Sequence, residues 1–374
     1  MFIVILWVII SIVVIRQPLF SLQEMNATPL FILQVIPPAY WAIVRIFGVI
    51  IMGFAMISMT NHYFPKSKLR SLIFFTTMPW IFIVAHEFNP MVLTFLLILS
   101  MYLAFPKLKK YLLSLIVMFL LFLTFKYNPF TAKHIIDKIR MLPQFFNLTN
   151  LFMQMEPISS YLHIPRNGYF SYIFLVPFIS SFYLITKKGV KLLKQFTLPI
   201  IFSLYFFILY PSNHLIFAGV GFLLLLSIYI VGAFNKITGN KIIALGCIII
   251  AVGLLGYFIE SYVRQYPMKY SVERSEAKIN LVNYIITHPD KKIILPNDDD
   301  LRKLMTYYGK HADFSHVSFI ENERAFMKNI AVCKEESTAC VLDDVGIERY
   351  KVDKNIPEIE HITLKNALSV YYIY

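Results

Sequence analysis

Residues 74–105, FFTTMPWIFIVAHEFNPMVLTFLLILSMYLAF, decide the fold of this chain, because they hold two long apolar runs joined by a short polar break. The break carries His86, Glu87 and Asn89, with no Lys or Arg. A helix of about 20 apolar residues crosses the hydrocarbon core of a bilayer. Two such runs with so short a connection predict consecutive membrane spans that meet at one face of the membrane.

The rest of the chain has the same character. Hydrophobic residues make up 57% of its 374 residues and charged residues only 15%, which excludes an ordinary soluble globular protein. The first apolar run lacks a basic region before it and a small-residue cleavage site, so we interpret it as a retained span or signal anchor. We expect a polytopic α-helical membrane protein with about nine spans, at residues 2–15, 42–62, 71–87, 89–105, 111–127, 169–186, 196–211, 214–234 and 241–260.

The basic residues of the connecting segments predict the orientation. Alternate short connections are rich in Lys, and the positive-inside rule assigns these to the cytoplasm. We therefore expect a multi-pass protein of the plasma (inner) membrane with a cytoplasmic N-terminus. Its first loop (16–41), long loop (128–168) and tail (from 261) would be extracytoplasmic. The Lys-rich connections carry Lys66, Lys68 and Arg70, then Lys107, Lys109 and Lys110, then Lys187, Lys188, Lys191 and Lys194, and finally Lys236 and Lys241.

The net charge of +13 also comes from basic residues in the apolar part of the chain. Residues 1–261 hold 19 Lys and Arg against five acidic residues, whereas residues 262–374 hold 16 basic and 17 acidic residues. A nucleic-acid-binding protein would carry its basic excess on a soluble fold. Because the excess here flanks apolar spans, we expect no nucleic-acid partner.

The tail predicts a small extracytoplasmic α/β domain over residues 261–374, after a transmembrane domain over residues 1–260. Strand-like runs such as KKIILPN and ACVLDDV alternate with helical runs such as DLRKLMTYYGK. This alternation is typical of a small α/β fold with a partly parallel sheet.

Two groups of polar residues in the tail have alternative interpretations. Asp298, Asp299 and Asp300 could bind a divalent cation, or they could stabilise the N-terminus of the helix that follows them. Cys333 and Cys340 could form a disulfide if the tail lies outside the reducing cytosol.

The long loop contains a segment with helical periodicity, TAKHIIDKIRMLPQF. The pattern predicts an amphipathic helix at the membrane interface. Packing on the helix bundle and contact with lipid phosphates both remain open interpretations of this helix. Its apolar residues are Ile135, Ile136, Ile139 and Leu142, and they alternate with Lys133, Asp137, Lys138 and Arg140.

Ionisable residues at membrane depth are costly and therefore mark candidate sites. Five basic residues lie near the expected outer ends of spans, where they could hold phosphate oxygens through charge-assisted hydrogen bonds. Basic side chains at span ends also reach the interface without binding anything, so both interpretations stay open. The five residues are Arg45, His86, Lys126, Arg166 and His214.

The order of the segments resembles a known family, the GT-C glycosyltransferases, in particular the prokaryotic relatives of dolichyl-phosphate-mannose protein mannosyltransferases. The similar segments are PPAYWAIVRIFGVIIMGF, PKSKLR, residues 74–105, NGYFSYIFLVPFISSFYLITKK, YPSNHLIFAGVGFLLLLSIYIVGAF and the tail from YFIESYVRQYPMKYS onward. The resemblance covers most of the chain as an order of segments, without one diagnostic motif. The matching positions include Arg45, Pro79, Trp80, His86, Glu87 and Asn89.

The resemblance implies an inverting hexosyltransferase of the cell envelope. Such an enzyme transfers a sugar from a polyprenyl-phosphate-linked donor to a glycan, lipid or protein acceptor, alone or with a partner in a membrane complex. A general base would deprotonate the acceptor hydroxyl, and cations would stabilise the leaving phosphate. The family keeps its acidic residue in the first outer loop, where this chain has Glu24. Glu87 and Glu156 are further carboxylates on the same side, and the five basic residues are candidates for the lipid phosphate.

This chain departs from the family in its first outer loop. The loop is shorter than in the family, and residues 1–136 contain no Asp. The alternative function is therefore a catalytically inactive GT-C-like scaffold, an accessory subunit or a lipid-phosphate-binding membrane protein. No cofactor is implied beyond the donor lipid and, at the three consecutive aspartates of the tail, a divalent cation.

Overall fold

The computed structural model of the chain describes residues 41–87, 89–127, 132–154, 167–210, 214–273, 276–296, 299–309, 312–320, 338–343, 360–362 and 371–373. These residues form two compact units, one from Ala42 to Tyr266 and one from Pro267 onward, and each is described by itself. The predicted first span and residues 16–40 of the first outer loop lie outside the described residues.

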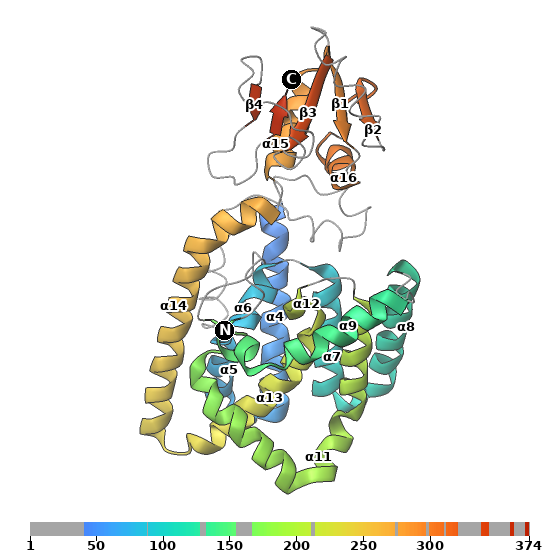
Figure 1. The fold of residues 1–374 in the computed structure, drawn as a ribbon. Coiled ribbons are helices and arrows are strands. Elements are labelled where there is room, and N and C mark those ends of the chain that lie inside the picture. The colour runs from blue at the N-terminus through green and yellow to red at the C-terminus, as the bar shows by residue number, and fades with distance from the viewer. Residues whose placement is uncertain are drawn as a thin grey trace. The chain divides into compact units, whose positions relative to one another are not determined.

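Apolar helices make up the first unit (Figure 1). Four of them, α4, α8, α13 and α14, are long and apolar enough to cross a membrane, counted over the described residues. This confirms the predicted class, a helical membrane protein. The helices are α4 (Trp41–Tyr63), α5 (Lys68–Thr76), α6 (Pro79–His86), α7 (Pro90–Ala104), η2 (Pro106–Leu108), α8 (Lys109–Tyr127), α9 (Ala132–Phe145), α10 (Leu148–Phe152), η3 (Tyr172–Phe174), α11 (Leu175–Leu209), α12 (Leu215–Ala218), α13 (Val220–Ile237) and α14 (Lys241–Glu273).

The run predicted as one span at 71–87 forms two helices. α5 and α6 meet at Thr77 and Met78 with a bend of 69°. α6 begins at Pro79, which fits the first turn of a helix but cannot continue the helix before it. Every residue of α6 is buried, so apolar side chains continue across the bend. This continuity explains why the sequence predicted a single span.

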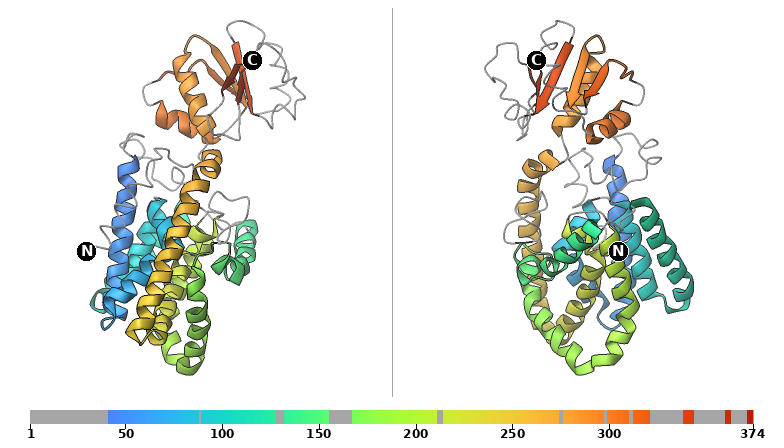
Figure 2. Two further views of the ribbon diagram at one scale, coloured as in Figure 1. Left: turned by 90° about the vertical axis from the view of Figure 1, so that its left-hand side faces the viewer. Right: turned by 45° about the vertical axis from the view of Figure 1, so that its right-hand side comes forward.

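α11 joins what the sequence predicts as two spans. Its 35 residues remain helical through the expected connection at Lys187–Lys194. Figures 1 and 2 show that the helix is V-shaped, so its two apolar arms run in opposite directions. Lys and Leu are good helix formers, which explains why the connection is helical. The run predicted as one span at 214–234 is interrupted, as the run at 71–87 is: Gly219 separates α12 from α13.

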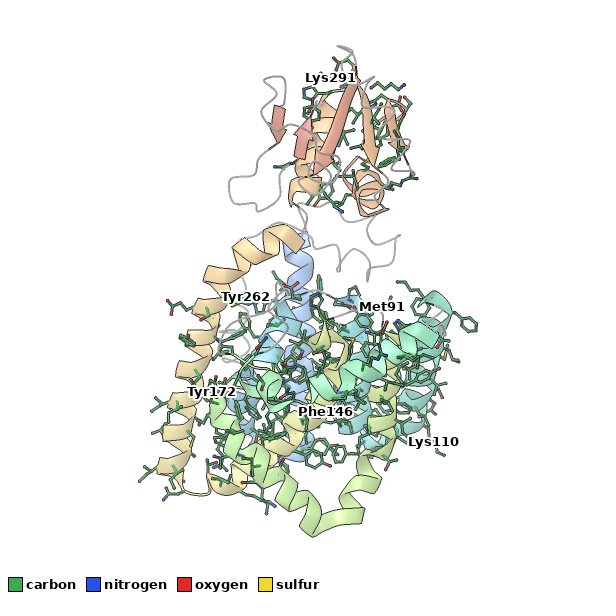
Figure 3. The ribbon with its side chains drawn as sticks, in the orientation of Figure 1. Met91, Lys110, Phe146, Tyr172, Tyr262 and Lys291 are labelled. Carbon is green, nitrogen blue, oxygen red and sulfur yellow. The ribbon has the colours of Figure 1, made fainter. Side chains whose placement is uncertain are left out.

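The two ends of the first unit differ in charge. Figure 1 shows the turns between α4 and α5, between α7 and α8, and between α13 and α14 at the same end as the apex of α11. These are the Lys-rich connections of the sequence. The break between α6 and α7 lies at the other end, as the labels of Lys110 and Met91 in Figure 3 illustrate. The Lys-rich connections thus gather at one end of the first unit and the polar break lies at the other; which end faces the cytoplasm stays a prediction.

α8 and α14 turn long apolar faces away from the rest of the first unit. Phe125 is 83% exposed on α8 and Ile242 is 81% exposed on α14. α13, in contrast, is mostly buried among the other helices. Lipid tails would cover such faces without cost, because a membrane does not require a polar outer surface.

The second unit contains a mixed five-stranded sheet with strand order β2-β1-β3-β5-β4. β1 pairs in parallel with β2 and β3, whereas β5 pairs antiparallel with β3 and β4. The sheet is thus partly parallel, as the alternating runs of the tail predict. Its elements are α15 (Glu276–Thr287), β1 (Lys292–Pro296), α16 (Asp299–Tyr308), β2 (Val317–Ile320), β3 (Thr338–Asp343), β4 (Glu360–Ile362) and β5 (Tyr371–Ile373).

The core of the second unit lies where β1 meets the two helices. Ile293, Ile294 and Leu295 of β1 are buried, and so are Leu301 and Leu304 of α16. α14 runs unbroken from Lys241 to Glu273, past the predicted domain boundary at 260/261 and the boundary between the two units at 266/267.

Candidate functional site

A buried polar break lies between α6 and α7, at the end of the first unit opposite the Lys-rich connections. α6 ends at His86, and Glu87 follows it in an extended conformation. Asn89 then caps α7, because its side-chain oxygen accepts a hydrogen bond of 3.2 Å from the backbone N–H of Val92. His86, Glu87 and Asn89 are only 4%, 1% and 2% exposed. The chain therefore turns here with its polar side chains inside the protein.

Phe82, one turn before His86, orders two of the polar side chains. The His86 Nδ1 atom lies 2.6 Å from the carbonyl oxygen of Phe82, and the two rings stack with centroids 3.9 Å apart. Because a carbonyl oxygen only accepts, Nδ1 donates the proton, and Nε2 is the acceptor of the neutral ring. Phe82 also contacts the ring of Tyr262 edge to face, with centroids 5.6 Å apart.

Tyr262 connects α14 to the carboxylate of Glu87. Its hydroxyl donates a hydrogen bond of 3.3 Å to Oε1 of Glu87, and both residues are 1% exposed. Figure 3 labels Tyr262 at the same end of the first unit as Met91. A carboxylate buried among apolar helices is costly and is by default a candidate functional group.

Asn89 extends the polar network to the C-terminal end of α11. Its Nδ2 atom donates a hydrogen bond to the hydroxyl of Tyr210, which is 3% exposed and stacks on Phe206. We call His86, Glu87, Asn89, Tyr210 and Tyr262 the Glu87 cluster. It gathers side chains from α6, from the break before α7, from the end of α11 and from α14.

Close packing fixes α6 in place. Trp80 donates a hydrogen bond of 3.0 Å from Nε1 to the hydroxyl of Ser227 on α13, and its backbone N–H donates to the carbonyl oxygen of Tyr169 at 3.2 Å. On α4, a Cβ atom at Gly48 would lie 2.7 Å from the carbonyl oxygen of Ala85. Only glycine allows α4 and the last turn of α6 to approach so closely.

α9 lies across the helices at the same end of the first unit (Figure 1). The Nε2 atom of His134 lies 2.8 Å from the carbonyl oxygen of Ile208, near the C-terminus of α11. At its other end, Phe145 is fully buried, and its ring centroid lies 5.5 Å from that of Tyr169. Gly219 makes room for this ring, because a Cβ atom there would lie 2.2 Å from Phe145.

The face of α9 that packs on the bundle includes a lysine, while two of the isoleucines are exposed. Lys138 is 2% exposed, and its Nζ atom lies 5.8 Å from the ring centroid of Phe207 on α11. Ile136 and Ile139 are 47% and 57% exposed. Burial lowers the pKa of Lys138 from 10.5 to about 8, because desolvation disfavours the charged ammonium. α9 thus packs on the bundle through this face, and contact of the helix with lipid phosphates stays a prediction.

Three other predicted site residues lie at or near the ends of α12, α4 and α8. His214 precedes α12 at the same end of the first unit and is 8% exposed. Arg45 lies in the first turns of α4, three residues before Gly48 in the sequence. Lys126 lies in the last turn of α8, and its side chain is exposed.

Several predicted residues cannot be compared with the structure. Glu24, Glu156, Arg166, Asp298 and Cys333 lie outside the described residues. Asp299 and Asp300 lie in the first turn of α16, and both interpretations of them stay open. Cys340 lies in β3, opposite Ile294 of β1.

Tyr210, Tyr262 and His134 were not among the site residues predicted from the sequence, and Lys138 was named only as part of the amphipathic helix. The two tyrosines carry no charge and therefore gave no signal within apolar runs. His134 and Lys138 did carry a signal, because together with Phe145 they recur at the four- and seven-residue spacing of one helix face.

The arrangement combines one buried carboxylate, imidazole and phenol groups, and a buried amine at one end of a membrane-type helix bundle. Such groups can accept a proton and bind an anion. Within the described residues, no group of three His, Cys, Asp or Glu side chains could hold a metal ion. No protein-family model, no curated protein and no solved structure matches this chain.

Proposed function

We propose that the protein is an integral membrane glycosyltransferase that transfers a sugar from a polyprenyl-phosphate-linked donor to an acceptor at the extracytoplasmic face. The observation that carries the proposal is the buried carboxylate of Glu87, with its donor Tyr262, at the end of the bundle opposite the Lys-rich connections. The order of the sequence segments, which resembles the GT-C glycosyltransferases, supports the same assignment.

In this mechanism Glu87 is the general base. Its carboxylate takes the proton of the acceptor hydroxyl as the acceptor oxygen attacks C1 of the sugar. The bond between C1 and the phosphate oxygen breaks, and the polyprenyl monophosphate leaves with the electron pair of that bond. Attack from the face opposite the leaving group inverts the configuration at C1. Glu24 is the alternative base, because the family keeps its acidic residue in the first outer loop.

The proposal includes a GT-C-like arrangement of nine spans in the plasma membrane, with the N-terminus in the cytoplasm and the second unit outside. Single cysteines introduced by Lys107→Cys and Asp290→Cys, with the native cysteines replaced by serine, test the orientation. A membrane-impermeant maleimide should label position 290 in intact cells and position 107 only after lysis. The opposite pattern would reverse the orientation and place the Glu87 cluster at the cytoplasmic face.

Sugar transfer is tested with the full-length protein in proteoliposomes that contain polyprenyl-phosphate-linked mannose, glucose or galactose and an envelope extract as the acceptor source. The expected result is sugar-dependent release of polyprenyl monophosphate together with labelled acceptor. Inversion is read from the anomeric configuration of the product. If binding of the donor lipids were measured without release of monophosphate for any of them, the protein would be the lipid-phosphate-binding scaffold.

A further inference from the structure

We propose that Lys138, together with His134 on the inward face of α9, binds the phosphate group of the lipid-linked substrate. The inference deepens the proposed function and rests on it for the identity of the lipid. It adds a site that the five basic residues predicted from the sequence do not include.

The first argument is the choice of helix face. Lys138 is buried on the inward face of α9, together with the buried Phe145 and the partly buried Ile135 and Leu142, whereas Ile136 and Ile139 are exposed. The other described charges of α9 point outward, since Arg140 and Asp137 are 77% and 54% exposed. A helix that served only to cover the bundle would have an apolar residue at position 138.

The second argument is the position of the amine. The Nζ atom of Lys138 lies over Phe207, and His134 contacts the carbonyl oxygen of Ile208 at 2.8 Å. These two residues of α11 come directly before Leu209 and Tyr210, and Tyr210 accepts the hydrogen bond from Asn89 in the Glu87 cluster. The amine thus lies against the same turn of α11 that leads to Tyr210, the hydrogen-bond partner of Asn89.

The third argument is chemical. An ammonium group is a compact charge that binds phosphate oxygens strongly, and the interaction strengthens where water is excluded. The exposed isoleucines of α9 are suited to lipid, so the polyprenyl chain of a ligand can remain in the hydrocarbon while its phosphate meets the inward face of the helix.

The test measures binding and requires no catalysis. The full-length protein is placed in phosphatidylcholine nanodiscs, and the Kd for a radiolabelled polyprenyl monophosphate is determined for wild type, Lys138→Met, Lys138→Arg and the control Arg140→Gln. Removing one charged partner of a phosphate should raise Kd about tenfold or more. We expect this for Lys138→Met, partial recovery for Lys138→Arg, and a change of less than about twofold for Arg140→Gln, an exposed pair.

Each outcome of this binding test supports the phosphate site or refutes one stated part of the proposal. Thermal unfolding of each variant in the same nanodiscs establishes that it is folded. Wild-type affinity in a folded Lys138→Met variant, or equal loss in Arg140→Gln, would overturn the assignment. Equal competition by phosphatidylglycerol or by inorganic phosphate would overturn the lipid-substrate identity. A Lys138-dependent Kd in a protein that transfers no sugar would uphold the phosphate site and refute the glycosyltransferase.

Discussion

Lys138→Met should make the protein more stable, although it removes a charge from a helix that packs on the bundle. The lysine has a pKa of about 8 in the folded chain against 10.5 in an unfolded one. Each pKa unit corresponds to about 1.4 kcal/mol, so burial of the ammonium costs about 3 kcal/mol of unfolding free energy at neutral pH. Methionine fills a similar volume without a charge and removes that cost.

The pH dependence gives the prediction its sign. The folded state binds this proton less tightly than the unfolded state, so the penalty is fully present below about pH 8. It shrinks between pH 8 and pH 10.5, because the lysine is then neutral in the folded protein, and it disappears above pH 10.5. The advantage of Lys138→Met should therefore be largest near neutral pH and should decline as the pH rises through this window.

The assay is reversible denaturant unfolding of the detergent-solubilised protein between about pH 7 and pH 10, followed by tryptophan fluorescence. Arg140→Met is the control, because Arg140 lies on the exposed face of the same helix. Its unfolding free energy should change by less than about 1 kcal/mol. A Lys138→Met variant that is less stable than wild type, or whose advantage does not depend on pH, would refute the view that the buried ammonium is a cost retained for function.

Two further substitutions test the packing and the polar contacts of the Glu87 cluster. Gly48→Ala should lower the unfolding free energy by about 1–3 kcal/mol, because its Cβ would lie 2.7 Å from a carbonyl oxygen in the last turn of α6. Gly246→Ala should not lower the unfolding free energy, because a Cβ atom at this position would have no neighbouring atom within 4 Å. Tyr262→Phe should reduce sugar transfer about tenfold through loss of the hydrogen bond to Glu87, while Tyr257→Phe, at an exposed position of the same helix, should leave it unchanged. Equal stability of Gly48→Ala and Gly246→Ala would contradict the close approach of α4 to α6. Equal transfer rates of Tyr262→Phe and Tyr257→Phe would contradict a role for the hydrogen bond to Glu87.

The sequence predicted the helical membrane class and the polar break between α6 and α7, because both depend on local composition. The bend between α5 and α6 was missed since Pro79 lies between apolar residues on both sides. Hydropathy measures only how apolar a run is, and not whether the backbone continues straight. The proline itself carried the information, because it opens helices and ends the preceding one.

The inward face of α9 shows a different limit. Periodicity predicted an amphipathic helix, but it could not determine which of the charged residues meets the bundle: Lys138 is buried, whereas Asp137 and Arg140 are exposed. That choice depends on Phe207, Ile208 and Gly219, which are distant in sequence and receive Lys138, His134 and Phe145. The contact between Tyr262 and Glu87 is similar, since it joins residues 175 positions apart.

The most direct test of the account is the rate at which the full-length protein releases polyprenyl monophosphate from its donor in proteoliposomes, compared among wild type, Glu87→Gln, Glu24→Gln and Glu260→Gln. Loss of a general base lowers the rate about 10²–10⁴-fold. We predict such a loss for Glu87→Gln, with no more than a small loss for Glu260→Gln, whose side chain is exposed on α14. A wild-type rate for Glu87→Gln, with the large loss appearing instead in Glu24→Gln, would contradict the assignment of Glu87 as the base.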